Sequence, residues 1–131
     1  MHSMVKVTDL TANFRHVRLL RARDKAHPTG EPSEGYDLLV PLDVNGALHL
    51  DDWKTHRAFC RVRRFARGGE ERVGRLERTS EGQWYFDYEE GEDDDEIGFR
   101  LGEEQFTPGE YVSVWHDDVM RTYQVQQVER P

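Results

Sequence analysis

Apolar and polar residues alternate along most of this chain with a period of two, which is typical of strands that are buried on one face. Trp84, Phe86 and Tyr88 give the clearest example. The pattern predicts about eight strands, with approximate ranges of 14–23, 36–42, 60–67, 72–79, 83–88, 97–101, 111–116 and 120–129. Glycines, prolines and charged residues separate these ranges and predict loops between them, including a long loop at 24–35.

One stretch departs from the strand pattern and predicts a short helix. Asp51 and Asp52 suit its first turn, and Trp53 shares a helical face with His56 and Arg57. A single helix gives no repeated strand–helix–strand order, which argues against a parallel doubly wound sheet. We therefore predict an all-β fold, or a mainly β fold with one short helix, arranged as a small antiparallel β-barrel or barrel-like sandwich. Closure is preferred because it removes exposed strand edges.

The length of the chain and its single cysteine set the expected domain organisation and compartment. With 131 residues, we predict one β-rich domain over 1–131, a partly flexible N-terminal segment at 1–12 and an acidic loop at 87–96. The chain starts without the apolar stretch of a signal peptide, and its longest apolar run, Leu38–Leu42, is too short to cross a membrane. Because Cys60 is the only cysteine, a reducing, cytoplasmic location is the expectation.

Charge is distributed unevenly along the chain. The formal net charge is −8, yet residues 1–79 hold 15 of the 18 lysines and arginines, whereas residues 80–131 hold 15 of the 26 acidic residues. An acidic protein repels phosphate backbones, so its net charge disfavours nucleic-acid binding. We expect most of these charges to pair within the fold or to face solvent.

The acidic run at 87–96 is the most unusual segment of the sequence. Its closely spaced carboxylates repel one another, so we expect an extended loop that helps to keep the protein soluble. Docking onto a basic partner, or binding of a divalent cation through oxygen ligands, is an alternative role. Asp93, Asp94 and Asp95 are the candidate partner-binding residues of this run, which lacks the ligand spacing of a calcium loop.

Arginines in the first half of the chain give a second candidate surface. Arg61, Arg63 and Arg64 lie on the predicted strand at 60–67 and complete the candidate partner-binding set. Arginines beside Phe65 on a small barrel would also suit contacts with single-stranded nucleic acid, and we keep this as an alternative function. It requires Arg15, Arg61 and Arg63 to share one face without carboxylate partners.

A small-molecule or enzyme pocket at the end of the barrel is the third alternative, lined by Trp53, Trp84, Trp115 and His116. Tryptophans of a small barrel are otherwise core residues. No motif identifies catalytic groups: Cys60 is expected to be a small buried hydrophobe, and the six histidines lack metal-binding spacing. We predict no metal and no cofactor, and we favour a non-enzymatic role.

One segment resembles a known family. Phe106–Val114 reads FTPGEYVSV and is followed by Arg121–Tyr123, which resembles the barrel segment of the ferredoxin-reductase flavin domains. In that family an F-x-P-G-Q-Y-like strand precedes an R-x-Y-S strand, and their residues hold flavin. Here Glu110 stands in place of the usual glutamine and Gln124 in place of the serine. We take the resemblance to imply a barrel rather than a flavin site.

These features together favour a small cytoplasmic β-barrel of bacterial type that acts as a binding module through protein–protein contacts. Single-stranded nucleic-acid binding and small-molecule binding remain the alternatives, and no membrane contact is expected. The order of the strands, the oligomeric state and the identity of any partner are left open by the sequence.

Overall fold

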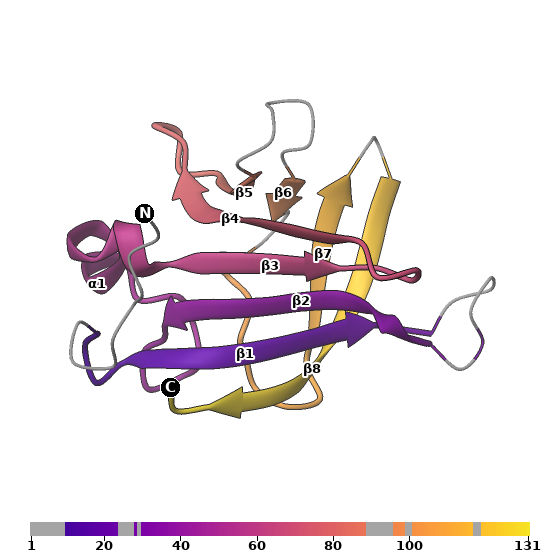
Figure 1. Ribbon diagram of the computed structural model, residues 1–131. Coiled ribbons are helices and arrows are strands. Elements are labelled where there is room, and N and C mark those ends of the chain that lie inside the picture. The colour runs from indigo at the N-terminus through magenta and orange to yellow at the C-terminus, as the bar shows by residue number, and fades with distance from the viewer. Residues whose placement is uncertain (1–9, 24–27, 29, 89–95, 99–100, 117–118) are drawn as a thin grey trace.

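The computed structural model describes residues 10–23, 28, 30–88, 96–98, 101–116 and 119–131. The strands are β1 (Phe14–Arg21), β2 (Glu31–Pro41), β3 (Arg61–Phe65), β4 (Glu71–Arg78), β5 (Trp84–Tyr88), β6 (Glu96–Gly98), β7 (Tyr111–His116) and β8 (Val119–Glu129). The helix α1 (Leu50–Thr55) and a single 3-10 turn, η2 (Arg57–Phe59), lie between β2 and β3 (Figure 1). The mainly β composition with one short α-helix confirms the predicted fold class.

The strands form a closed antiparallel barrel in which each strand pairs with the next one along the chain. The last strand returns to the first, where Leu19 of β1 lies opposite Val125 of β8. Closure of the ring gives each strand a paired neighbour on both sides. The predicted antiparallel barrel of about eight strands is therefore confirmed.

Side chains at alternate strand positions fill the interior. Tyr36 is fully buried, and its ring lies 4.9 Å from that of Tyr123 and 5.2 Å from that of Phe86, measured between ring centroids. The other fully buried large side chains include Phe14, Leu19, Leu76, Leu101, Phe106 and Val62. An eight-stranded barrel has an interior just wide enough for such side chains to pack together, and this packing is the core of the domain.

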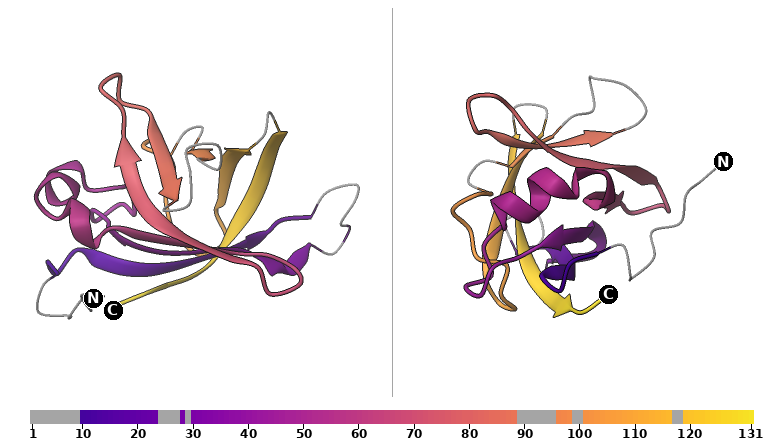
Figure 2. Two further views of the ribbon diagram at one scale, coloured as in Figure 1. Left: turned by 45° about the horizontal axis from the view of Figure 1, so that its top comes forward. Right: turned by 90° about the vertical axis from the view of Figure 1, so that its left-hand side faces the viewer.

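Helix α1 closes one end of the barrel, where β2 ends and β3 begins (Figure 2). Its one buried residue is Trp53, whose ring packs edge-on against Trp84 at a centroid distance of 4.9 Å. The Trp53 indole N–H donates to the backbone carbonyl of Leu76 at 2.9 Å. Asp51 and Asp52 lie in the first turn of the helix, as predicted, while His49 is the N-cap.

A polar cluster fixes the segment before β1 onto this helix. The Asp52 carboxylate accepts hydrogen bonds from Asn13 Nδ2 at 2.7 Å and from Thr11 Oγ1 at 2.8 Å. The bond from Asn13 is the main cause of a lowered pKa for the Asp52 carboxyl. Residues 10–13 are therefore held against α1. The rest of the segment predicted to be partly flexible, residues 1–9, lies outside the described part of the chain.

The extent of β2 is the largest difference from the sequence-based expectation. Residues 31–35 belong to this strand rather than to the predicted loop at 24–35. The prolines and glycines that suggested a loop are accommodated because the β1–β2 register shifts between Leu20 and Arg21. Gly35 permits the close approach there, since a Cβ at this position would lie 1.9 Å from the Leu19 carbonyl oxygen. Among the described residues, no helix is long and apolar enough to cross a membrane.

Candidate functional site

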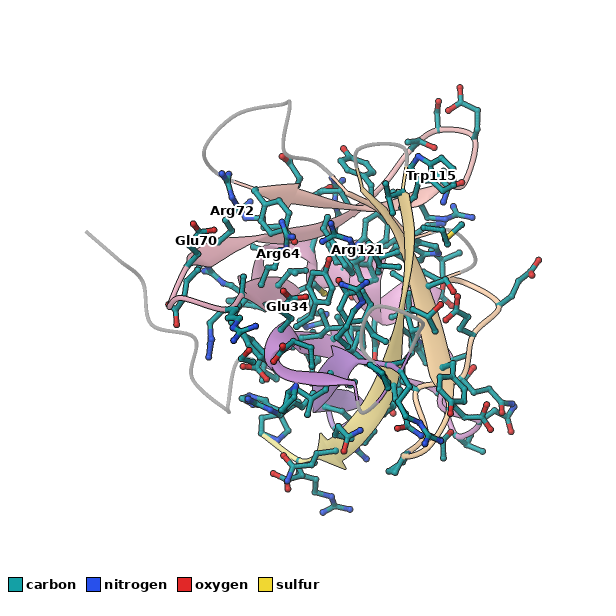
Figure 3. The ribbon with its side chains drawn as sticks, turned by 90° about the vertical axis from the view of Figure 1, so that its right-hand side faces the viewer. Glu34, Arg64, Glu70, Arg72, Trp115 and Arg121 are labelled. Carbon is teal, nitrogen blue, oxygen red and sulfur yellow. The ribbon has the colours of Figure 1, made fainter. Side chains whose placement is uncertain are left out.

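The two ends of the barrel differ in character. Helix α1 covers one end, whereas the opposite end, at which β1 and β3 finish and β2 and β4 begin, carries no helix in the described chain. We call this second end the mouth. Figure 3 looks onto it and shows Arg64 and Arg121 near the centre of the opening, with Glu34 beside them.

The register of the strands points a row of arginines into the mouth. Residues directly opposite each other on neighbouring strands share a face, and the buried Tyr36 lies opposite Arg64, which in turn lies opposite Arg72. The same reasoning applies to Arg21, which lies opposite the buried Tyr123. It applies also to Arg121, opposite the buried Val114. Four arginines therefore lie on the inner face near the mouth, and all four are half-buried.

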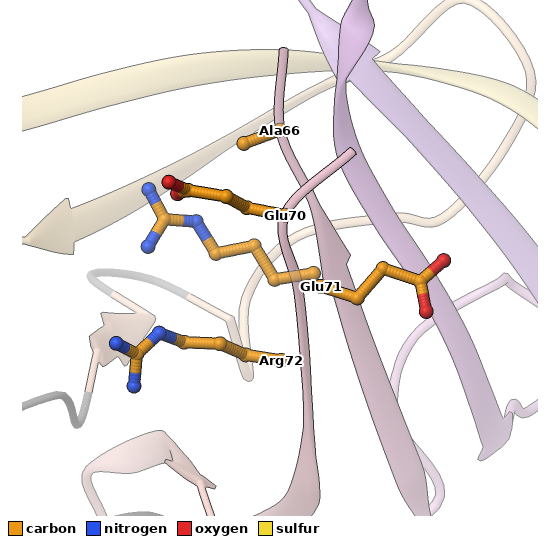
Figure 4. A pocket seen from close by; sticks show the side chains of 5 residues that line it. Ala66, Glu70, Glu71 and Arg72 are labelled. Carbon is orange, nitrogen blue, oxygen red and sulfur yellow. The ribbon is translucent and has the colours of Figure 1, made fainter. Parts of the chain in front are cut away.

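Several glutamates share this end of the barrel; Glu31, for example, lies directly opposite Arg21, and its side chain is 16% exposed. Glu34 accepts a hydrogen bond from Arg21 at 3.2 Å, and these two side chains are only 26% and 13% exposed. Glu70 lies on the same side of the β3–β4 hairpin as Arg72 (Figure 4). We refer to the whole set as the mouth cluster, which consists of Arg21, Glu34, Arg64, Glu70, Arg72 and Arg121.

Part of the mouth cluster lines a small recess of about 250 Å³, together with Ala66 and Glu71. Glu71 points away from the other residues in Figure 4. Its carboxylate accepts from Arg63 on the outer face at 3.2 Å, so the recess is bordered mainly by Arg64, Glu70 and Arg72. This recess is smaller than most pockets for drug-sized ligands and suits a compact chemical group.

Buried tyrosines close the barrel beneath the mouth. Tyr36, Tyr88 and Tyr123 are all inward-facing and at most 3% exposed, so the core beneath the mouth is closed. Like charges directly opposite one another on paired strands destabilise a sheet. The placement of Arg64 opposite Arg72 therefore needs compensation, and both side chains have interactions of their own in the structure.

The predicted partner-binding arginines do not share one surface. Arg61 and Arg63 lie on the outer face of β3, whereas Arg64 points into the mouth. Arg63 forms ion pairs with Asp37 at 3.2 Å and with Glu71 at 3.2 Å. Its guanidinium carbon also lies 5.2 Å from the centroid of the Phe65 ring. The β3 arginines are thus divided between two faces, and one of the outer pair is already neutralised.

The face required for nucleic-acid binding is not formed by the residues that the sequence suggested. Arg15 lies opposite Val40 of β2, whereas Arg61 lies opposite the preceding residue of β2, Leu39. Neighbouring residues of a strand point to opposite faces. The Arg15 guanidinium donates to the backbone carbonyls of Ala12 and Phe14, at 2.8 and 2.7 Å. Arg15 and Arg61 therefore point to different sides of the sheet, and Arg63 does not lack carboxylate partners.

The four residues of the predicted pocket are also separated. Trp53 and Trp84 are buried together at the end that α1 closes. Trp115 lies on the outer face of β7 with 36% of its surface exposed, away from the group around Arg121 in Figure 3. His116 lies at the mouth end of β7, where its backbone pairs with Val119. The tryptophans therefore do not line one common pocket.

Two further sequence-based candidates are the acidic residues of the loop after β5 and the single cysteine. Asp93, Asp94 and Asp95 lie outside the described residues, between Tyr88 of β5 and Glu96 of β6. Cys60 is buried, and this burial raises the pKa of its thiol to about 12. Cys60 is therefore a core residue in the protonated form rather than an activated nucleophile. Within the described ranges, no three His, Cys, Asp or Glu side chains are grouped so that they could hold a metal ion.

Sequence reasoning missed Arg72 and Arg121 as site residues, although the signal was present in the strand alternation. Arg121 has the same parity as the inward Tyr123, and Arg72 has the same parity as Leu76. A charged residue at an inward position near the end of a barrel strand marks the opening. Recognising it requires the strand ends to be known accurately, and these are the least certain part of a sequence-based assignment.

The fold and the site together define a closed eight-stranded meander barrel with one sealed end and one arginine-lined mouth. Comparison with protein-family models, curated proteins and solved structures found no match to this chain. The functional assignment therefore rests on the residues of the mouth cluster themselves.

Proposed function

We propose that this protein binds a small anionic molecule at the mouth of its barrel. The observation that carries the proposal is the convergence of four arginines on inward positions of β1, β3, β4 and β8 at one end. Guanidinium groups present fixed forks of N–H donors that match carboxylate and phosphate oxygens. Because the four side chains are half-buried, their hydrogen bonds to an anion are less weakened by water than at an open surface.

The proposal is tested by calorimetric titration of the full chain at low ionic strength with phosphate, phenyl phosphate, benzoate and benzenesulfonate. An Arg121→Gln substitution removes one inward guanidinium without introducing a bulky group. We expect it to weaken binding of the best probe by about ten- to a hundredfold, which corresponds to the loss of a charge-assisted hydrogen bond.

Arg130→Gln is the matched control, because Arg130 is exposed and follows the end of β8 far from the mouth. It makes the same change in net charge and should leave affinity within about twofold, as expected for an exposed charge at a distance. Failure of all four anions to bind, or an equal loss in both variants, would contradict the proposal.

Protein–protein contact is a second candidate function, supported by a different surface. Tyr85, Ile97, Trp115 and Met120 lie opposite one another in a row across β5, β6, β7 and β8. Trp115 is 36% exposed on the outer face, and tryptophan is among the residues most enriched at interface hot spots. A partner that offers an apolar side chain to Trp115 would fit this row.

This second candidate predicts a specific pattern of capture from native lysate treated with nuclease. A stoichiometric protein partner should be retained by the wild-type chain and by Arg121→Gln, and lost with Trp115→Ser. Recovery of the same proteins with Trp115→Ser would exclude the row as the docking surface, whereas loss of all partners after nuclease treatment would favour nucleic acid.

A further inference from the structure

We propose a second binding site at the α1 end of the barrel, and its ligand is a carboxylate that carries an apolar aliphatic group. The carboxylate pairs with Arg15, and the aliphatic group lies in a recess beside that side chain. The site is separate from the mouth, because Arg15 stands near the start of β1 whereas Arg21 ends the strand. The right-hand view of Figure 2 looks onto this end of the barrel.

Two recesses meet at Arg15, which lines both of them. Their volumes are about 390 and 400 Å³, so each is larger than the recess of about 250 Å³ at the mouth and lies within the roughly 300–1,000 Å³ of small-molecule pockets. We call the first one the turn recess. Its apolar lining consists of Leu42, Val44, Phe106, Pro108 and Val128.

The turn recess is held in shape by the chain itself. The Phe106 backbone N–H donates to the Gly46 carbonyl at 2.7 Å, which ties its two loops together. The Asp43 carboxylate accepts two backbone N–H groups of its own loop, at 2.8 and 3.0 Å. Leu42 and Phe106 are only 6% and 1% exposed. A ligand therefore meets a preformed apolar surface, which lowers the ordering cost of binding.

Arg15 supplies the charged contact of this site. It is half-buried and lies opposite the buried Val40. One of its terminal nitrogens donates to the carbonyls of Ala12 and Phe14, at 2.8 and 2.7 Å, which fixes the guanidinium in place. Within the described part of the chain, no carboxylate forms an ion pair with it. Its remaining N–H donors match the two oxygens of a carboxylate.

The neighbouring charges define the position of the carboxylate. Among the described residues, Asp43 is the one acidic side chain that lines either recess, and Arg130 is the other cation. Neither Asp43 nor the chain end at Pro131, which lines the second recess, forms an ion pair with Arg15 in the described structure. Asp43 repels an anion that enters its side of the turn recess, so the carboxylate stays at Arg15 and the aliphatic group faces Val44 and Pro108.

The test is calorimetric titration of the full chain with octanoate, at concentrations where this acid stays monomeric. Acetate has the same head group without the chain and should bind at least about thirtyfold more weakly, because it lacks the buried methylene groups. Octyltrimethylammonium has the same chain with a cationic head and should bind at least about tenfold more weakly. N-acetylleucine separates two sources of the ligand: it binds more tightly than octanoate if the ligand is a peptide end, and less tightly if the ligand is a free acid.

Two pairs of variants locate the bound acid. Arg15→Gln should weaken octanoate binding about tenfold or more, whereas Arg75→Gln makes the same charge change on the exposed outer face of β4 and should leave affinity within about twofold. Val44→Ser should weaken binding about three- to tenfold. Because Val44 is 98% exposed, this substitution leaves the fold intact even if Arg15→Gln does not. Val73→Ser is its control on β4, with Val73 43% exposed.

Three results would overturn the proposal: octyltrimethylammonium binding as tightly as octanoate, equal effects of Val44→Ser and Val73→Ser, or no octanoate binding to the folded chain. Each leaves anion binding at the mouth standing, because that site is tested with phosphate and Arg121→Gln. Loss of octanoate binding in Arg121→Gln but not in Arg15→Gln would assign the acid to the mouth and contradict a second site.

Discussion

A Gly35→Ala variant is expected to lose about 3 kcal/mol or more of its free energy of unfolding. The added Cβ would lie 1.9 Å from the backbone oxygen of Leu19 and 3.0 Å from the Phe65 ring. A backbone atom cannot move aside as a flexible side chain can, so β1 and β2 would have to separate. Thermal unfolding followed by circular dichroism should show a decrease in Tm of about 10 °C or more.

Gly69→Ala is the control for this substitution. Gly69 has a positive φ of 85° but no heavy atom within 4 Å of an added Cβ. Its cost should therefore be limited to the backbone strain of about 1–2 kcal/mol. If Gly35→Ala is no more destabilising than Gly69→Ala, the close β1–β2 approach at the edge of the mouth is described incorrectly.

A Trp53→Ala variant is expected to destabilise the domain by about 3–5 kcal/mol, since it removes a buried indole and leaves a cavity. The indole is 5% exposed and packs on Trp84. Its N–H is also the donor to the Leu76 carbonyl, which would lose this bond. Chemical denaturation should show a lower midpoint with little change in slope.

Trp115→Ala is the matched control, because Trp115 is a tryptophan on the outer face of the same barrel. It should cost about 1 kcal/mol or less. The Trp53 variant should also keep its affinity for anions at temperatures where it remains folded, because α1 and the mouth are at opposite ends and distant sites act independently. Similar destabilisation by both tryptophan variants would contradict the description of α1 as the seal of the barrel.

Much of the fold was predictable from the alternation of apolar and polar residues. The inward set of Trp84, Phe86 and Tyr88 in β5 is visible in the sequence as a strict period of two. Closure was inferred from the cost of exposed edges and is realised by the pairing of β1 with β8. The start of β2 was missed, because Gly35 and the nearby prolines indicate a loop when read locally. The strand accommodates these residues because its register with β1 shifts between Leu20 and Arg21. This shift is a property of the assembled sheet and cannot be read from the sequence.

The site was predictable only in part, and for a physical reason. The sequence analysis considered a mouth pocket lined by tryptophans and His116 as one alternative, and it grouped Arg61, Arg63 and Arg64 as a separate docking surface. Neighbouring residues of a strand point to opposite faces, so Arg63 and Arg64 cannot act together. The residues that do converge with Arg64, such as Arg121, lie far away in the sequence. Their proximity is a consequence of strand order and closure.

The two ends of the barrel carry different kinds of side chains. The end covered by α1 contains the tryptophan pair, Trp53 and Trp84, together with the polar cluster around Asp52. The mouth carries half-buried charge that weakens the fold unless it is compensated.

The most direct test of anion binding at the mouth is a titration of the isotope-labelled chain with phenyl phosphate, followed through the side-chain Nε–H signals of its arginines by nuclear magnetic resonance. The account predicts that the largest shifts occur at Arg64, Arg72 and Arg121, while Arg61, Arg75 and Arg130 remain unchanged. Shifts confined to the outer arginines, or spread evenly over all of them, would contradict it and would place the anion on the surface of the barrel instead of in its mouth.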